Sequence, residues 1–205
     1  MPYLSEQGMQ ALGLKYLGKK VRISDRASIY EPELISIADY SRIDDFCVVS
    51  GNVTIGRNVH FPVFCNVAGG EPGITIGDFS CLAYGVHIFA QSDDYSGQTL
   101  TNSTIPDIYK CEKKKSVHVC RHCIVGASSV IMPGVVLAEG TAVGAMTLVT
   151  RSTEAWSIYV GIPARRIRER SRNLLLLEAR YLEEESTHDF DLIPSGLRIE
   201  TGGTG

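Results

Sequence analysis

Residues 119–149 read VCRHCIVGASSVIMPGVVLAEGTAVGAMTLV, and a large apolar residue stands at every sixth place in this stretch. The members of the series are Val119, Val125, Ile131, Leu137, Val143 and Val149. A period of six fits neither the 3.6-residue turn of an α-helix nor the alternation of a long strand. It indicates a short strand followed by a turn, with one bulky side chain pointing inward per repeat.

The same series runs through the upstream half of the chain, with a slip at 69–73 and a break at 93–118. Its members there are Ile37, Ile43, Val49, Ile55, Phe61, Val67, Ile76, Leu82 and Ile88. A column of small or β-branched residues stands four places after each apolar one. Three such units close one triangular coil, and stacked coils bury a continuous aliphatic column. The alternative is a β-sandwich with an accidental rhythm, which fifteen in-register matches argue against.

The pattern resembles the hexapeptide-repeat left-handed β-helix over residues 21–167, and the resemblance implies the handedness. We therefore expect an all-β fold with a protruding loop at 93–118 and a C-terminal α-helix. Residues 1–20 are predicted to form a helical cap. Residues 168–186 have the apolar stripe of an amphipathic helix, and 187–205 are predicted to form a loose tail.

Composition excludes several classes of protein. Twenty basic residues stand against 23 acidic ones, for a net charge of −3, so neither a nucleic acid nor an anionic membrane is an expected partner. No apolar run approaches the length of about 20 residues that spans a bilayer. The N-terminus lacks the order of a signal peptide, which predicts a cytoplasmic protein. The six cysteines are accordingly interpreted as reduced thiols, mostly buried in the repeat.

The end of the repeat carries a second resemblance. Gly161-Ile162-Pro163-Ala164-Arg165 matches the ending of hexapeptide acyltransferases, and acetyl-CoA is the cosubstrate that this implies. In that family the thiol arm lies along a groove beside small residues. The implied CoA-binding residues are Ala127, Ala145, Pro163, Arg165 and Arg166, with Arg168 as a further phosphate contact. The alternative is that Gly161–Arg165 is only a chain-reversing turn.

The acceptor side departs from the family pattern. The segment from Ile74 to Ile88 resembles the one that precedes a catalytic histidine in the galactoside, maltose and xenobiotic acetyltransferases, but here that position holds Asp93, followed by Asp94. A sugar hydroxyl needs a base before it attacks a thioester. An amine with a pKa of about 8 is already partly unprotonated at neutral pH. Asp93, assisted by Asp94, is therefore the predicted catalytic group, on the expectation that repulsion raises the pKa of one carboxyl. The alternative is a solvated turn.

Other residues are weaker candidates. His87 is the rival catalytic base, and His60 holds the equivalent place earlier in the repeat. The candidate acceptor-binding residues are Asn66, Tyr84, Asp44 and Asp45. The spacing of the histidines and cysteines in 118–123 suggests zinc, but the repeat register sends Cys123 and Cys120 in different directions, so no metal site is predicted.

We therefore expect an acetyl-CoA-dependent N-acetyltransferase acting on a nucleotide-linked deoxyamino sugar for surface polysaccharides such as O-antigen. RIDDFC at 42–47 and SDDYSG at 92–97 resemble nucleotide-4-amino-4,6-dideoxyglucose acyltransferases. The resemblance implies a homotrimer with a site in each cleft between protomers. One alternative is O-acetylation of a sugar or antibiotic hydroxyl with His87 as base. The alternative from another class is a zinc-dependent lyase or a non-catalytic scaffold.

Overall fold

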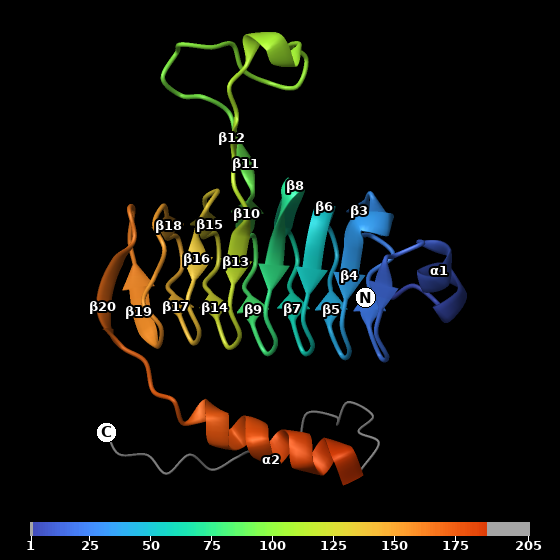
Figure 1. The fold of residues 1–205 in the computed structure, drawn as a ribbon. Helices are drawn as coiled ribbons and strands as arrows, with labels where there is room; N and C mark the ends of the chain where they lie inside the picture. The colour runs from blue at the N-terminus through green and yellow to red at the C-terminus, as the bar shows by residue number, and fades with distance from the viewer. Residues whose placement is uncertain (1, 188–205) are drawn as a thin grey trace. The chain divides into compact units, whose positions relative to one another are not determined.

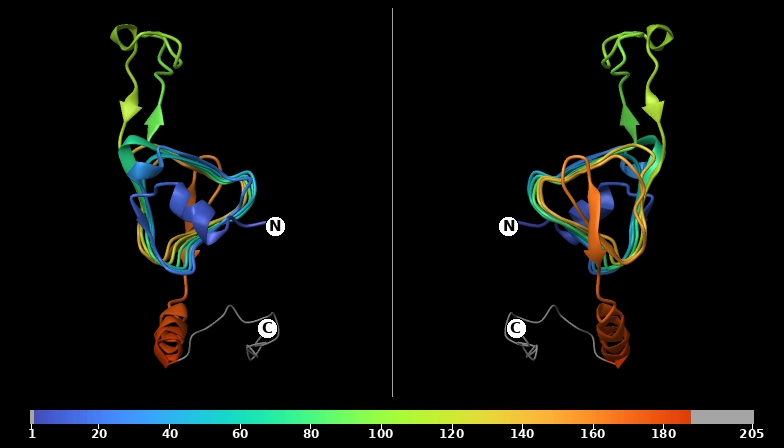
Figure 2. Two further views of the ribbon diagram at one scale, coloured as in Figure 1. Left: turned by 90° about the vertical axis from the view of Figure 1, so that its right-hand side faces the viewer. Right: turned by 90° about the vertical axis from the view of Figure 1, so that its left-hand side faces the viewer.

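A computed structural model describes residues 2–187 of the chain. Up to Arg170, the chain winds into stacked coils of triangular outline (Figures 1 and 2). Each coil contributes a short strand to each of three faces, and strands on neighbouring coils pair in parallel. The two longest strands, β6 and β8, bend from the first face to the second, which joins these faces into one ten-stranded sheet. The third face is a separate eight-stranded sheet.

The first face contains β3 (Ser28–Tyr30), β6 (Val48–Ile55), β8 (Asn66–Ile76), β10 (His87–Phe89), β15 (Val130–Ile131) and β18 (Leu148–Val149). The second face contains the far ends of β6 and β8 with β1 (Tyr16–Leu17), β4 (Ile35–Ile37), β13 (Val117–Val119) and β16 (Val136–Leu137). The third face contains β2 (Arg22–Ile23), β5 (Arg42–Ile43), β7 (His60–Phe61), β9 (Cys81–Leu82), β14 (Ile124–Val125), β17 (Ala142–Val143), β19 (Ser157–Val160) and β20 (Arg165–Glu169).

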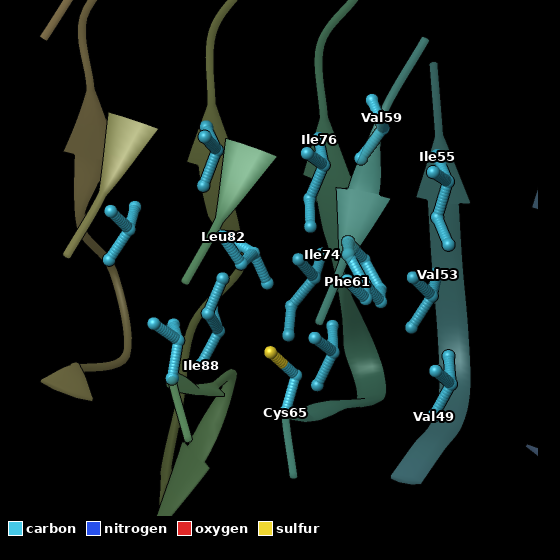
Figure 3. Close-up of a cluster of buried hydrophobic side chains, with 14 of the residues drawn as sticks. Val49, Val53, Ile55, Val59, Phe61, Cys65, Ile74, Ile76, Leu82 and Ile88 are labelled. Atoms are coloured by element: carbon cyan, nitrogen blue, oxygen red, sulfur yellow. The ribbon is translucent and has the colours of Figure 1, made fainter. Parts of the chain in front are cut away.

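The six-residue series forms the core, as predicted. None of its fifteen side chains is more than 3% exposed. Figure 3 shows part of the series, with Phe61 and Leu82 among the aliphatic side chains that cluster inside the coil. The small column is also buried, except for half-buried Ser92 at the start of the protruding hairpin. Serine at these inward places is satisfied by the backbone: Ser129 Oγ donates to Gly144 O (2.8 Å) and accepts from Thr147 N (3.1 Å) on the next coil.

Two corners are built from residues with left-handed backbone, one per coil. In each row, the residue's N–H donates to the carbonyl that precedes its counterpart on the previous coil. We call the row between the third and first faces the open corner: Phe46, Phe64, Gly85, Ser128 and Met146. We call the row between the second and third faces the closed corner: Tyr40, Asn58, Phe79, His122, Gly140 and Trp156.

The predicted loop leaves the remaining corner of the coil (Figure 2). Its stem is an antiparallel hairpin of β11 (Gln91–Ser92) and β12 (Lys113–Lys114), and its distal part contains the 3₁₀ turn η2 (Asp107–Tyr109). The sequence between β11 and β12 is mainly polar, which agrees with the projection of this loop away from the core.

The ends of the chain are partly helical. Helix α1 (Glu6–Ala11) begins after Ser5, whose Oγ accepts from Gly8 N (3.1 Å), and a 3₁₀ turn, η1 (Pro32–Leu34), precedes β4. Helix α2 (Leu174–Thr187) starts six residues later than expected, because β20 pairs antiparallel with β19. Most of the predicted tail lies outside the described residues. No helix within residues 2–187 is long and apolar enough to cross a membrane.

The core predicts the first test. Leu82→Ala removes a fully buried side chain from the aliphatic column, and the neighbouring coils restrict collapse of the cavity. We expect a loss of about 3 kcal/mol in the free energy of unfolding, measured by urea denaturation. Thr54→Ala, on the exposed side of β6, is the control and is expected to cost less than about 0.5 kcal/mol. Equal effects of the two substitutions would contradict the assignment of the core.

Candidate active site

The open corner borders a groove of about 470 Å³ on the first face. Its residues come from four successive coils: Phe46, Val48, Phe64, Cys65, Asn66, Gly85, His87 and Ser128. The rings of Phe46 and Phe64 stack with centroids 5.3 Å apart, and both side chains are about half exposed or more, at 49% and 60%. An exposed aromatic wall beside polar side chains is typical of a small-molecule site.

His87 and Asn66 place polar groups in this groove. They are direct neighbours on adjacent strands of the first face. His87 Nδ1 is buried and has no hydrogen-bond partner among residues 2–187. The imidazole also stacks on Phe89, with centroids 5.9 Å apart, and Phe89 borders a second groove that contains Asp93. A buried ring nitrogen without a partner is unfavourable unless a ligand or water satisfies it.

The residues that the family resemblance implied for CoA lie along the C-terminal part of the open corner. Ala127 and Ala145 directly precede Ser128 and Met146 of that row. Leu148 on β18, two residues after Met146, is bonded to the next turn: its N donates to Gly161 O (3.1 Å), and Ala164 N donates to Leu148 O (2.8 Å). Pro163, between Gly161 and Ala164, therefore lies beside β18 on the next turn. The structure brings these positions together on successive coils.

The arginines of β20 differ in their availability. Arg165 is exposed, and within residues 2–187 its guanidinium bonds only to the adjacent Ala164 carbonyl, to which Nη1 donates (3.3 Å). Arg166 Nε donates to Ser157 Oγ (2.9 Å) and lies 3.2 Å from Glu154 Oε2. A phosphate could therefore reach Arg165 directly, whereas Arg166 would first leave its present partners.

Asp93 and Asp94 stand at the base of the protruding loop and differ in their surroundings. Asp93 borders two grooves, and its Oδ1 accepts from Asn102 N (3.2 Å). No other hydrogen bond to its carboxylate is found within residues 2–187. Asp94 is held by the loop: it accepts from Ser96 N (2.9 Å), Ser96 Oγ (2.8 Å) and Thr99 Oγ1 (3.2 Å).

The hydrogen bonds to Asp94 exclude it as the carboxyl whose pKa is raised. The bond from the backbone N–H of Ser96, followed by that from its hydroxyl, holds the pKa of Asp94 below its ordinary value. Repulsion between the two carboxyls therefore does not raise the pKa of Asp94. This carboxylate stays ionised and orders the loop, while Asp93 is the more available of the pair.

Asp44 and Asp45 are buried, with exposures of 2% and 9%. Their carboxylates are already bonded to other side chains of the same chain. Asp44 Oδ2 accepts from Arg42 Nη2 (2.8 Å) and lies 2.9 Å from His60 Nε2. Asp45 accepts from Ser24 Oγ and lies 3.7 Å from Arg26. These contacts tie neighbouring coils together. The contact with Asp44 also engages the ring of His60, which was the further candidate for a catalytic histidine.

Three further candidates have clear positions. Tyr84 is 64% exposed next to Gly85 at the open corner, and Asn66 borders the groove, so both are open to an acceptor. His122 is buried in the closed corner, where its ring stacks on Phe79 (5.7 Å). Cys123 points into the core, so the 118–123 motif is divided between a corner and the interior.

The pair Phe46–Phe64 was not among the predicted site residues. Both stand at a left-handed turn and point outward, so they are outside the buried series that the six-residue period identifies. The signal that would have found them is their position one coil apart, eighteen residues along the chain, in the same outward column.

No protein-family model matches the chain. The dTDP-4-amino-4,6-dideoxy-D-glucose acyltransferase of Escherichia coli is 38% identical over 182 residues, which cover 87% of this chain and 94% of that protein. A hexapeptide-repeat acetyltransferase of Vibrio cholerae shares the fold, with a TM-score of 0.53 at 20% identity over 82% of each chain.

Solved structures of AntD, an N-acyltransferase from Bacillus cereus, are more similar. One contains dTDP and 3-hydroxybutyryl-CoA; it has a TM-score of 0.88 and 42% identity over 91% of this chain and all of that one. A variant of AntD with dTDP-4-amino-4,6-dideoxyglucose and coenzyme A has a TM-score of 0.88 and 44% identity over 89% of this chain and 98% of that one.

The fold and these similarities define an acyltransferase of the hexapeptide-repeat β-helix class. Within that class, the chain belongs to the dTDP-4-amino-4,6-dideoxyglucose acyltransferase family.

The Asp44 network predicts a pH dependence of stability. Burial pushes the pKa of Asp44 upward, but the hydrogen bonds with Arg42 and His60 outweigh it, so the pKa lies below its ordinary value. A lowered pKa stabilises the fold above the unfolded-state pKa of about 4, and this contribution is lost as the pH falls through the folded-state pKa. Asp44→Asn should therefore cost about 2 kcal/mol at pH 7 and progressively less below about pH 4.

Urea denaturation at a series of pH values measures this difference. Asp25→Asn, at an exposed position, is the matched control and should not change the stability profile. If the cost of Asp44→Asn were the same at pH 3 and pH 7, the proposed ionic network would be refuted.

Proposed function

We propose that this chain is an acyl-CoA-dependent N-acyltransferase that acts on the amino group of a nucleotide-linked 4-amino-4,6-dideoxy sugar, with acetyl-CoA as donor. The observation that carries the proposal is the carboxylate of Asp93, with one backbone hydrogen bond, beside two grooves where relatives of other branches have a histidine. Membership of a family whose relatives include an enzyme named for this sugar supports the substrate class. We also propose that the product serves surface polysaccharides such as O-antigen, and that the reaction takes place in the cytoplasm.

The reaction requires the protein mainly to position the amine against the thioester and to supply a negative charge beside the amine. An ionised Asp93 attracts the substrate ammonium and holds the amine that forms from it against the thioester. The nitrogen lone pair attacks the carbonyl carbon, and Asp93 is positioned to accept the proton that the nitrogen loses as the amide forms. The carbon–sulfur bond breaks, and the departing sulfur takes up that proton, so that CoA leaves as the thiol.

We propose that each site lies between two protomers of a homotrimer. Asp93 stands at the loop corner, whereas Ala127 and Ala145 stand at the open corner, across the width of the first face. Along β15 the path from Ser128 to Met132, a neighbour of Asp93, is about 13 Å at the usual rise of a strand. A thioester at the open corner of one protomer can therefore meet Asp93 most directly from the adjacent protomer.

An amine acceptor is preferred over a hydroxyl because Asp93 is a weak base. O-acylation with His87 as base is the alternative to test, since His87 borders the open-corner groove and its Nδ1 has no hydrogen-bond partner among residues 2–187. CoA release with matched 4-amino and 4-hydroxy nucleotide sugars separates the two. Turnover of the hydroxyl acceptor alone would contradict the proposal.

Asp93→Asn tests the role of the carboxylate. The substitution keeps the size of the side chain and the hydrogen bond from Asn102 N, but it removes the negative charge and the group that accepts a proton. We expect kcat to fall by about 100-fold or more, with KM for acetyl-CoA unchanged. Asp107→Asn, on the same loop with an exposed carboxylate, is the control and should retain full activity. A kcat within about threefold of wild type in Asp93→Asn would rule out the assigned role.

Complementation tests the placement between protomers. Asp93→Asn and Ala145→Trp each inactivate a different half of the site and should be inactive alone. Unfolded and refolded together in equal amounts, they should recover about a quarter of wild-type activity, because random mixing joins the two intact halves at that frequency. Light scattering should give three times the 22.4 kDa chain mass. An inactive mixture of trimers would show that both halves belong to one chain.

A further inference from the structure

The hairpin that carries Asp93 has little main-chain bonding to the coils. The ladder between β10 and β8 ends at the pair Phe89 and Ala68, and Ala90 N then donates to Ala68 O (3.0 Å). Residues 91–116 make no main-chain hydrogen bond to a neighbouring coil within the described range 2–187. The stem of β11 and β12 therefore stands outside the two large sheets (Figure 2), and side chains at its base set its direction.

Gln91, the first residue of the stem, lies along the backbone of Gly70 on the preceding coil. β11 contacts β8 at this corner. A Cβ atom on Gly70 would overlap Gln91 Oε1, and it would lie 2.6 Å from Gln91 Cδ and 3.2 Å from Gln91 Cγ. Three bonded atoms of the glutamine side chain therefore occupy the space that a side chain at position 70 would need.

The fold itself does not require a glycine at position 70. Gly70 has φ +50°, and Phe46 at +58° and Ser128 at +56° adopt similar angles with side chains. Gly51, one coil earlier, is different: a Cβ atom there would lie 2.7 Å from Gly70 Cα, so backbone packs against backbone. At Gly70 the nearest obstacle is only the flexible side chain of Gln91. The glycine is therefore explained by the place that it gives to Gln91.

The returning leg of the hairpin has a similar contact with the following coil. Lys115, directly after β12, lies along Gly134, where a Cβ atom would lie 3.0 Å from Lys115 Cδ and 3.3 Å from Lys115 Cβ. Lys115 N also donates to Ala90 O (3.0 Å), which ties the two legs together. Gly134 has a left-handed backbone, at φ +85°. The base of the hairpin is thus held between two glycines, one on each neighbouring coil.

Asp93 depends on the direction of this stem. It follows Gln91 by two residues, so that on an extended chain both side chains point to the same side. Both residues border the same two grooves. The Asp93 carboxylate accepts its hydrogen bond from Asn102 N of the same loop. A tilt of the stem would therefore move Asp93 and its hydrogen-bond partner together.

We infer that Gln91 is a positioning residue for Asp93: packed on Gly70, and opposed by Lys115 on Gly134, it fixes the direction of the stem. This inference rests on the proposed function. The side chain acts through its length and its packing, not through its amide. A misplacement of the reacting groups by about 1 Å can lower turnover by about 100-fold, so a small tilt is enough to matter.

Steady-state kinetics with acetyl-CoA and a nucleotide-linked 4-amino sugar test the inference. Gly70→Ala displaces Gln91 and should lower kcat by about tenfold or more, with KM for acetyl-CoA within about twofold of wild type. Gly73→Ala is the matched control for backbone strain. Gly73 lies on the same strand with φ +90°, and its Cβ would lie nearest to Asn52, so this variant should keep the wild-type kcat.

Substitutions of Gln91 separate packing from hydrogen bonding. Gln91→Ala removes the atoms that lie on Gly70 and should lower kcat as much as Gly70→Ala does. Gln91→Met keeps the length of the side chain without the amide and should keep kcat within about threefold of wild type. The double variant Gly70→Ala/Gln91→Ala should be no slower than either single variant, because both substitutions remove one contact.

Hydrogen–deuterium exchange gives a readout that does not depend on activity. Peptides from residues 90–116, followed by mass spectrometry, should exchange several times faster in Gly70→Ala and Gln91→Ala than in the wild type. Gly73→Ala should leave the exchange of these peptides unchanged. Faster exchange confined to the hairpin is the signature expected of a stem that has lost its fixed direction.

Each result decides the matter. A wild-type kcat in folded Gly70→Ala or Gln91→Ala would overturn the inference while wild-type turnover upholds the proposed function. Equal losses in Gln91→Met and Gln91→Ala would assign the amide to substrate binding and would also overturn it. A wild-type protein that acylates no nucleotide amino sugar would refute the proposed function, and exchange would then decide whether Gln91 fixes the stem. If Gly70→Ala does not fold, the two Gln91 variants carry the test.

Discussion

The constraint on which the structure depends is that every coil must place one bulky side chain inward on each face, in register with the coil before it. Fifteen buried residues at a spacing of six meet this requirement, and parallel pairing then aligns each coil with its neighbours. Alignment of the interior also aligns the exterior, so residues at equivalent outward places form rows. The site arises from such rows: rings at the open corner, small residues further along it, and a carboxylate at the loop corner.

The interior could be predicted from the sequence because burial imposes a strict chemical rule, and a period of six has few structural solutions. The outward rows follow no such rule. Insertions of different length, at 69–73 and 93–118, shift the spacing between coils, so Phe64 and Gly85 are not recognisable as neighbours from their numbers. The start of α2 was also placed too early, because β20 pairs with β19 as far as Glu169, which lies inside the predicted helix of residues 168–186.

The four candidate aspartates show why site residues are harder to predict than core residues. All four occur as Asp-Asp pairs, yet Asp44 and Asp45 are buried in contacts between coils and Asp94 is held by its own loop. Asp93 differs only in what surrounds it, which depends on the path of the protruding hairpin. The sequence could identify a change from histidine to aspartate; the relative availability of the four carboxylates required the structure.

The most direct measurement of the central claim is a crystal structure of the protein with CoA and a nucleotide-linked 4-amino sugar bound together. The account predicts that the sugar nitrogen lies about 3 Å from an Asp93 carboxylate oxygen, with the CoA sulfur beside it at the open corner of an adjacent protomer. A sugar nitrogen held by another group, with Asp93 facing solvent about 10 Å or more away, would contradict it.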